Sequence, residues 1–80
     1  MAISDREREW ADKARRYLKA ELKRADVTYA ELARRLNEHG IADETEGSVT
    51  AKLARGTFSV TFFLAVLTVL GIEAVTLAAL

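Results

Sequence analysis

Cysteine is absent from the 80 residues, and this excludes disulfide bonds, thiolate metal sites and a cysteine nucleophile. Histidine occurs once, at His39, which argues against a histidine metal site and against a serine–histidine triad within one chain. The sequence also lacks paired carboxylates, a nucleophile beside a base and a phosphate-binding loop. A domain of this size is too small for a deep pocket. We therefore expect no enzyme, no cofactor, no metal and no small-molecule substrate.

Net charge is also absent, since 12 basic residues balance 12 acidic residues. This balance argues against a general polyanion binder, because such domains are usually basic. The charges are unevenly placed, however. Residues 13–24 contain six basic residues and one acidic residue, Glu21, which gives this stretch a net charge of +5. Contacts to phosphate groups are therefore expected first in this stretch.

The chain has no uninterrupted apolar run that could span a membrane. Glu73 is the only charged residue from Thr57 to Leu80, but Gly71 and Glu73 interrupt this region. The segment Val60–Ile72 has 13 residues, whereas a spanning helix needs about 20. A buried helix is therefore favoured over a membrane span. The first residues have no apolar core of a secretory signal, so a cytoplasmic protein is expected.

Proline is absent as well. Hydroxyl residues and four glycines supply the signals for helix starts and ends instead. Start and stop signals predict helices over residues 4–24, 28–39, 43–55 and 59–70. Thr28 with Glu31 three residues later is typical of a capping box. Asp43 and Glu46 place acidic groups where the third helix should begin. Gly40 is the expected left-handed stop of the second helix.

Apolar spacing predicts which parts of these helices are buried. Trp10 lies on an apolar stripe of the first helix and is expected to anchor the core. The helix over residues 59–70 is apolar on all sides, so it should be buried all round or face a second chain. Residues 74–77 should form a short strand or an extended segment. The apolar end, Leu77–Leu80, fits a dimer contact.

Several motifs resemble those of known families. Thr28–Ala33 reads Thr-Tyr-Ala-Glu-Leu-Ala. It resembles the opening of the second helix in lambda-repressor-like (Xre-type) helix-turn-helix regulators, where the usual pattern is Thr-Gln-x-Glu-Leu-Ala. Ser48–Gly56 resembles the end of their recognition helix, and Phe63–Ile72 resembles their fourth helix. Residues 10–77 are also similar to a small bacterial family of unknown function, with Thr-Tyr-Ala-Glu-Leu-Ala, a later Glu-Thr-Glu, and Arg-Gly-x-Phe-Ser-x-x-Phe-Phe-Leu.

The resemblance implies one all-α domain over residues 1–80, a compact lambda-repressor-like fold of four to five helices. It also implies a small DNA-binding protein that regulates transcription by binding double-stranded DNA. Two features depart from the regulators. Tyr29 replaces their usual Gln, and the link over residues 37–46 is longer than their tight turn. In the regulators the tight turn sets the angle at which the third helix meets a groove, and the longer link changes this feature.

The DNA hypothesis assigns roles to two groups of residues. The residues expected to read bases are Tyr29, Thr45, Ser48, Thr50, Lys52 and Arg55. Those expected to hold phosphates are Arg15, Lys19, Lys23 and Arg34. Solvated helix faces would explain the same residues. A homodimer through the helix over residues 59–70 and the tail is expected. Two alternatives remain open: a protein–protein interaction module that binds no DNA, and a membrane-associated protein using residues 58–80.

Overall fold

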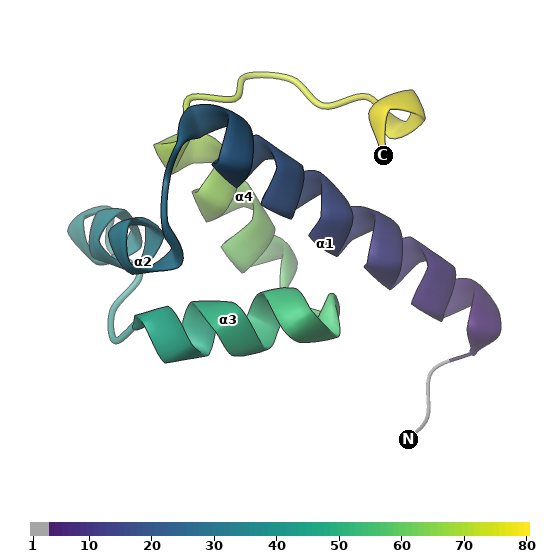
Figure 1. Cartoon of the computed structure of the whole chain (residues 1–80), viewed down its shortest axis with the longest axis horizontal. Coiled ribbons are helices and arrows are strands. Elements are labelled where there is room, and N and C mark those ends of the chain that lie inside the picture. The colour runs from purple at the N-terminus through teal and green to yellow at the C-terminus, as the bar shows by residue number, and fades with distance from the viewer. Residues whose placement is uncertain (1–3) are drawn as a thin grey trace.

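The computed structural model describes residues 4–80, which form four α-helices and a final 3-10 turn, with no strand in that range. The elements are α1 (Asp5–Ala25), α2 (Tyr29–Glu38), α3 (Glu46–Arg55), α4 (Val60–Val69) and the 3-10 turn η1 (Leu77–Ala79). The expected all-α class is therefore confirmed. Figure 1 shows the long α1 running diagonally across the molecule, with α2 near one end and α3 along the lower edge.

Each α-helix begins after a hydroxyl side chain that accepts a hydrogen bond from the backbone N–H three residues later. These N-caps are Ser4, Thr28, Thr45 and Ser59, with N–H···Oγ distances of 3.0–3.1 Å. Such a bond satisfies one of the backbone donors that a helix start leaves free. The predicted bounds of α1, α2 and α4 agree with the structure to within one residue at each end.

The predicted start of α3 near Asp43 is wrong, because Thr45 is the N-cap and the helix begins at Glu46. Asp43 has a φ of 67°, in the left-handed region, whereas an N-cap residue needs an extended backbone. Thr45 and Ser48 form the capping box instead. The Ser48 N–H donates to Thr45 Oγ1 at 3.1 Å, and the Thr45 N–H donates to Ser48 Oγ at 2.9 Å.

The core lies where one side of each helix meets the others. α2 packs against both α3 and α4, and α3 packs against α1. Burying a large apolar side chain fully stabilises the fold by about 1.5–3 kcal/mol. The largest fully buried side chains are Leu18, Leu22, Leu32, Leu36, Val49, Leu53 and Val66. The apolar staple at the start of α4 also forms, with the Phe58 and Phe63 rings stacked at 6.2 Å.

The end of α3 approaches α1 so closely that only glycine fits there. Gly56 is buried, with a φ of 73° that favours glycine. A Cβ atom at this position would lie 2.5 Å from the carbonyl oxygen of Ala11 and 3.0 Å from its carbonyl carbon. This contact sets the C-terminal end of α3, including Arg55, against the first half of α1.

One prediction about buried residues is wrong, and one of the two alternatives for α4 is excluded. Trp10 is 60% exposed, because the N-terminal part of α1 projects beyond the other helices (Figure 1). α4 is not buried on all sides, since Val60 is 73% exposed and Leu64 is 56% exposed. Only the side of α4 that carries Phe62 and Val66 faces the core.

The tail after α4 forms no strand, and the extended alternative is confirmed. It leaves α4 near Gly71, returns alongside α1 and ends in η1 (Figure 1). Within residues 4–80, no helix is long and apolar enough to cross a membrane alone. α3 and α4 reach that length and composition only together, as a pair bent by 118°.

Candidate functional site

The link between α2 and α3 is organised around a buried carboxylate. Glu44 is only 6% exposed. Its Oε2 forms an ion pair with Lys52 Nζ, and its Oε1 accepts a hydrogen bond from Ser48 Oγ at 2.5 Å. Burial alone would raise the pKa of Glu44, but the hydrogen bonds from Lys52 and Ser48 outweigh it and lower the pKa. The carboxylate therefore stays ionised at neutral pH and ties the link to α3.

Asn37 ties the same link to the end of α2. Its Nδ2 donates to the Glu44 carbonyl oxygen at 3.0 Å, and its Oδ1 accepts from the Glu44 N–H at 3.0 Å. Lys52 reaches further and places its Nζ 4.9 Å from the centre of the Phe62 ring on α4. We call Asn37, Glu44, Ser48, Lys52 and Phe62 the Glu44 cluster. It joins three helices and holds the long link in one arrangement.

The Glu44 cluster changes the roles expected of the α3 residues. Lys52 does not project outward as predicted, because it is bound to Glu44 and lies over Phe62. Ser48 and Thr45 are occupied by the capping box. The Thr50 hydroxyl donates to the carbonyl oxygen of Glu46 at 2.8 Å, although Thr50 remains exposed. Lys52, Ser48 and Thr45 are therefore better described as residues that position α3.

Arg55 and Tyr29, which are also expected to read bases, differ in how far they are exposed. Arg55 is exposed and forms no ion pair within residues 4–80. Tyr29 is half-buried and packs against the core, so its ring supports the fold. Arg55 is thus the one cation of α3 that is available for an external contact in the described part of the chain.

Arg34, which is expected to hold a phosphate, is paired with two acidic residues of α2. Arg34 Nη2 lies 2.7 Å from Glu31 Oε2, and Arg34 Nη1 pairs with Glu38. The hydrogen bond from Arg34, joined by one from Arg35, lowers the pKa of Glu31 to about 2. The predicted capping box at α2 therefore forms only in part: the Glu31 N–H donates to Thr28 Oγ1 at 3.1 Å, but the Glu31 carboxylate binds the two arginines.

One side of α1 carries cations next to the end of α3. Ala11 touches Gly56, and Arg8, Arg15 and Lys19 lie three, four and eight residues from Ala11, which places them near the same side of the helix. Each step of four residues turns by about 40° around the helix. Lys23, which is also expected to hold a phosphate, therefore lies further round α1 from Ala11 than Lys19 does. We call Arg8, Arg15, Lys19 and Arg55 the basic edge.

One member of the basic edge has an acidic partner. Arg15 Nε lies 3.0 Å from Asp12 Oδ1, and both side chains are partly exposed. Exposed pairs of this kind contribute about 0–1 kcal/mol, so a phosphate could replace the carboxylate at little cost. Arg8 and Lys19 have no ion pair within residues 4–80.

Residues 10–75 match the family model described as "Domain of unknown function (DUF6471)". The chain belongs to the DUF6471 family. The expectation of a small family of unknown function is confirmed, and the match covers α2, α3, α4 and α1 from Trp10 onward. No curated protein and no solved structure matches the chain. In the part of the DUF6471 chain that the structure describes, no group of His, Asp or Glu side chains could hold a metal ion.

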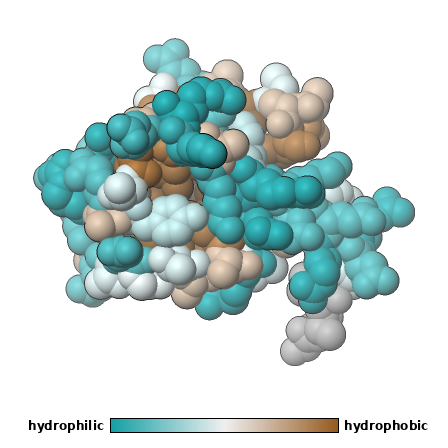
Figure 2. All heavy atoms as spheres, in the orientation of Figure 1, coloured by the Kyte–Doolittle hydropathy of each residue, from teal (hydrophilic) through white to brown (hydrophobic). Residues whose placement is uncertain are grey.

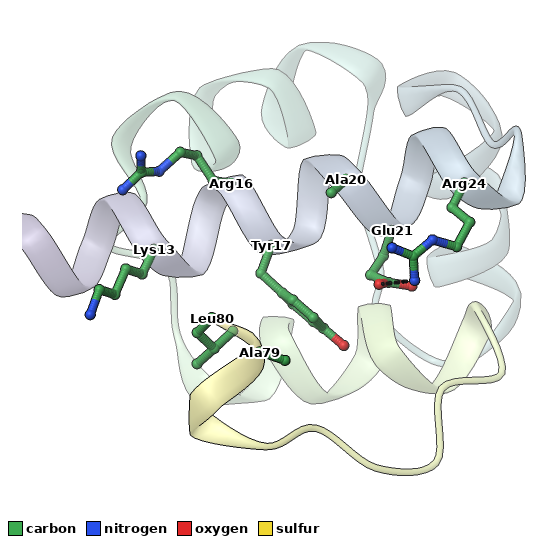
Figure 3. A pocket seen from close by; sticks show the side chains of 8 residues that line it. All are labelled: Lys13, Arg16, Tyr17, Ala20, Glu21, Arg24, Ala79 and Leu80. Atoms are coloured by element: carbon green, nitrogen blue, oxygen red, sulfur yellow. Dashed lines mark hydrogen bonds and ion pairs between the residues drawn. The ribbon is translucent and has the colours of Figure 1, made fainter.

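The other side of α1 in this DUF6471 domain borders a groove that the sequence did not reveal. It has a volume of about 580 Å³ and lies between α1 and η1. Figure 3 shows Tyr17 extending from α1 towards the tail, with Ala79 and Leu80 on the opposite wall. Glu21 on α1 pairs with Arg24 at 2.8 Å. Tyr17 sits in the apolar stripe, so the sequence pattern indicated only core packing at this position.

An apolar hollow of about 390 Å³ adjoins this groove. It is lined by Trp10, Lys13, Leu77 and Leu80, two of which also line the groove. Figure 2 shows an apolar surface at the upper right, over the C-terminal turn, beside hydrophilic atoms. Leu77 is 87% exposed. The hollow and the groove lie side by side along α1 and share Lys13 and Leu80, and we call them together the channel.

Proposed function

We propose that this DUF6471 domain is a small DNA-binding protein, a transcriptional regulator in which α2 and α3 act as a helix-turn-helix pair of the lambda-repressor-like (Xre) type. The observation that carries the proposal is the basic edge, which lies beside the C-terminal end of α3 in a molecule without net charge. Clustered cations beside an exposed helix are the electrostatic footprint of a DNA surface. The resemblance of Thr28–Ala33 to the regulators supports the same function.

The proposed interface uses the outward side of α3. Its exposed residues include Gly47, Thr50, Ala51, Ala54 and Arg55. The three smallest of them allow the helix backbone to approach a major groove closely, and Arg55 can reach a guanine or a phosphate. Arg8, Arg15 and Lys19 bind the backbone phosphates. The Glu44 cluster contributes indirectly, by fixing the angle at which α3 meets the DNA.

A homodimer remains part of this proposal. Val60 and Leu64 lie four residues apart on the exposed side of α4, and both are more than half exposed. Two copies that cover these side chains would present two α3 helices related by a two-fold axis. Such a dimer would read half-sites about 34–36 Å apart on DNA.

The test is binding of a labelled random-sequence duplex by fluorescence anisotropy, at about 50 and 200 mM salt. Phosphate contacts release counterions, so affinity should fall steeply between the two concentrations. Lys19→Ala should reduce the slope of log K against log salt by about 1. Arg55→Ala should weaken binding as well.

Arg34→Ala is the matched control. It removes one positive charge, as Lys19→Ala does, but from a side chain already bound to Glu31 and Glu38. It should leave the salt slope unchanged. If the folded protein does not bind duplex at the lower salt, or if all three variants behave alike, the basic edge is not a DNA surface.

A second candidate function is a protein–protein interaction module on the same scaffold. The exposed apolar channel along α1 favours it, since exposed apolar surface next to polar residues marks interaction sites. The two functions use different sides of α1, and one domain can perform both.

A further inference from the structure

The channel along α1 combines an apolar part with a basic part. Its apolar part is formed by Trp10, Leu77 and Leu80, and Trp10 is 60% exposed. Its basic part is formed by Lys13 and Arg16 on α1. Neither has a carboxylate partner within residues 4–80, although Arg16 Nε donates to the Asp12 carbonyl oxygen at 3.1 Å. The channel therefore offers an apolar contact and uncompensated positive charge side by side.

The apolar part and the basic part of the channel together indicate which kind of molecule can bind there. A small ligand buries about 70–90% of its surface in its pocket, which a channel that leaves Trp10 largely exposed does not provide. A nucleic acid would use the cations but would leave the leucines without apolar partners. A polypeptide with acidic side chains around an apolar anchor matches both parts of the channel.

The exposed side of α4 in a second copy does not meet these requirements. α4 contains no acidic residue and so has no carboxylate to pair with Lys13 or Arg16. The dimer contact proposed for Val60 and Leu64 is therefore a different surface. A separate acidic protein segment is the occupant that the charges favour.

We propose that the channel between α1 and η1 binds an acidic segment of another protein. An apolar side chain of that segment lies against Trp10 and Leu77, and its carboxylates pair with Lys13 and Arg16. Aromatic and arginine side chains contribute most to such contacts, and Trp10 is the central one here. The proposal is independent of DNA binding, because none of its residues belongs to the basic edge.

The experiment uses the whole chain as bait for a displayed library of random 16-residue peptides. Selected peptides should be enriched in Asp and Glu around one or two large apolar residues. Trp10 is the only tryptophan in the sequence. Binding of a selected peptide that lacks tryptophan should therefore shift the fluorescence emission of Trp10. Trp10→Ala should weaken peptide binding at least ten-fold, measured by anisotropy of the labelled peptide. Lys13→Glu should do the same.

Lys23→Glu is the matched control for Lys13→Glu. It makes the same charge change on α1, but Lys23 lines neither the groove nor the hollow. It should leave peptide affinity within about two-fold of wild type. Circular dichroism of each variant should show that α1 remains folded.

Five outcomes overturn the proposal, and the first four concern the selected peptides. They are no enriched peptide, enriched peptides without acidic residues, equal affinity for wild type and Trp10→Ala, and displacement of the bound peptide by random-sequence duplex. The fourth outcome would make the channel a nucleic-acid surface. A change from monomer to dimer that blocks the peptide would assign the channel to a second copy of the chain.

Discussion

The link between α2 and α3 differs from the channel along α1 in whether its charged side chains have partners within the chain. Around the link, Glu44 is satisfied by Lys52, Ser48 and Asn37. Along the channel, Lys13 has no acidic partner in the described chain, and Trp10 and Leu77 remain exposed. The paired residues around Glu44 hold the link in one arrangement. Charged and apolar residues without internal partners are the ones available for contacts with other molecules.

The largest effect is expected at Gly56. Gly56→Ala forces a Cβ against the Ala11 carbonyl group and places alanine at a φ of 73°. The left-handed backbone and the steric clash together should cost about 2–5 kcal/mol in the free energy of unfolding. Gly40→Ala is the control, because Gly40 has a φ of 94° but no atom within 4 Å of an added Cβ. Urea denaturation should show a clearly smaller loss for Gly40→Ala.

The second effect tests whether the link depends on its internal ion pair. Glu44→Gln leaves the Lys52 ammonium without its carboxylate on a partly buried site, with an expected loss of about 1–3 kcal/mol. Asp43→Asn, at the exposed neighbouring residue, should change stability by no more than about 0.5 kcal/mol. Equal losses in the two variants would mean that the ion pair does not hold the link together.

A smaller effect concerns acid stability at α2. The pKa of Glu31 is lower in the folded protein, at about 2, than the ordinary value of 4.5. Its stabilising contribution is therefore complete above pH 4.5 and is lost as the pH falls towards 2. The difference in Tm between wild type and Glu31→Gln should narrow over this range. A difference that stays constant over this range would mean that Arg34 and Arg35 do not keep Glu31 ionised in the folded protein.

The smallest effect is expected at Trp10. Because its side chain is mostly exposed, Trp10→Ala should change the free energy of unfolding by about 0.5 kcal/mol or less. Fully buried Leu18→Ala should cost about 2–5 kcal/mol in the same urea titration. A large loss for Trp10→Ala would mean that Trp10 belongs to the core and would weaken the contrast between the two regions.

The sequence was sufficient to predict most of the helices, because their signals are local. Ser59 and Thr28 act within three residues of themselves, and Gly40 ends α2 as expected. The pair of Glu44 and Lys52 was not foreseen, since eight residues separate the partners and only the folded link brings them together. For the same reason, the sequence pattern could not distinguish an outward Lys52 from an inward one.

The exposure of Trp10 could not be predicted from spacing either. An apolar stripe shows which side of α1 faces inward, but not how far along α1 the other helices extend. The C-terminal turn that forms the opposite wall of the channel comes from residues far away in the sequence. The DNA-binding residues remain a prediction. Lys52, Ser48 and Arg34 have partners within the folded chain that the sequence pattern did not reveal.

The four hydroxyl N-caps have a consequence for the state of the chain at low pH. A hydroxyl group carries no charge between pH 2 and 8, unlike the aspartate that often caps a helix. Acid therefore removes the carboxylate pairs of Glu31 and Glu44 but leaves the hydroxyl N-caps chemically unchanged. We expect the acid state to retain much of its helical circular dichroism while α3 loses its fixed angle to α2. In this chain, helix formation and helix placement depend on chemically different groups.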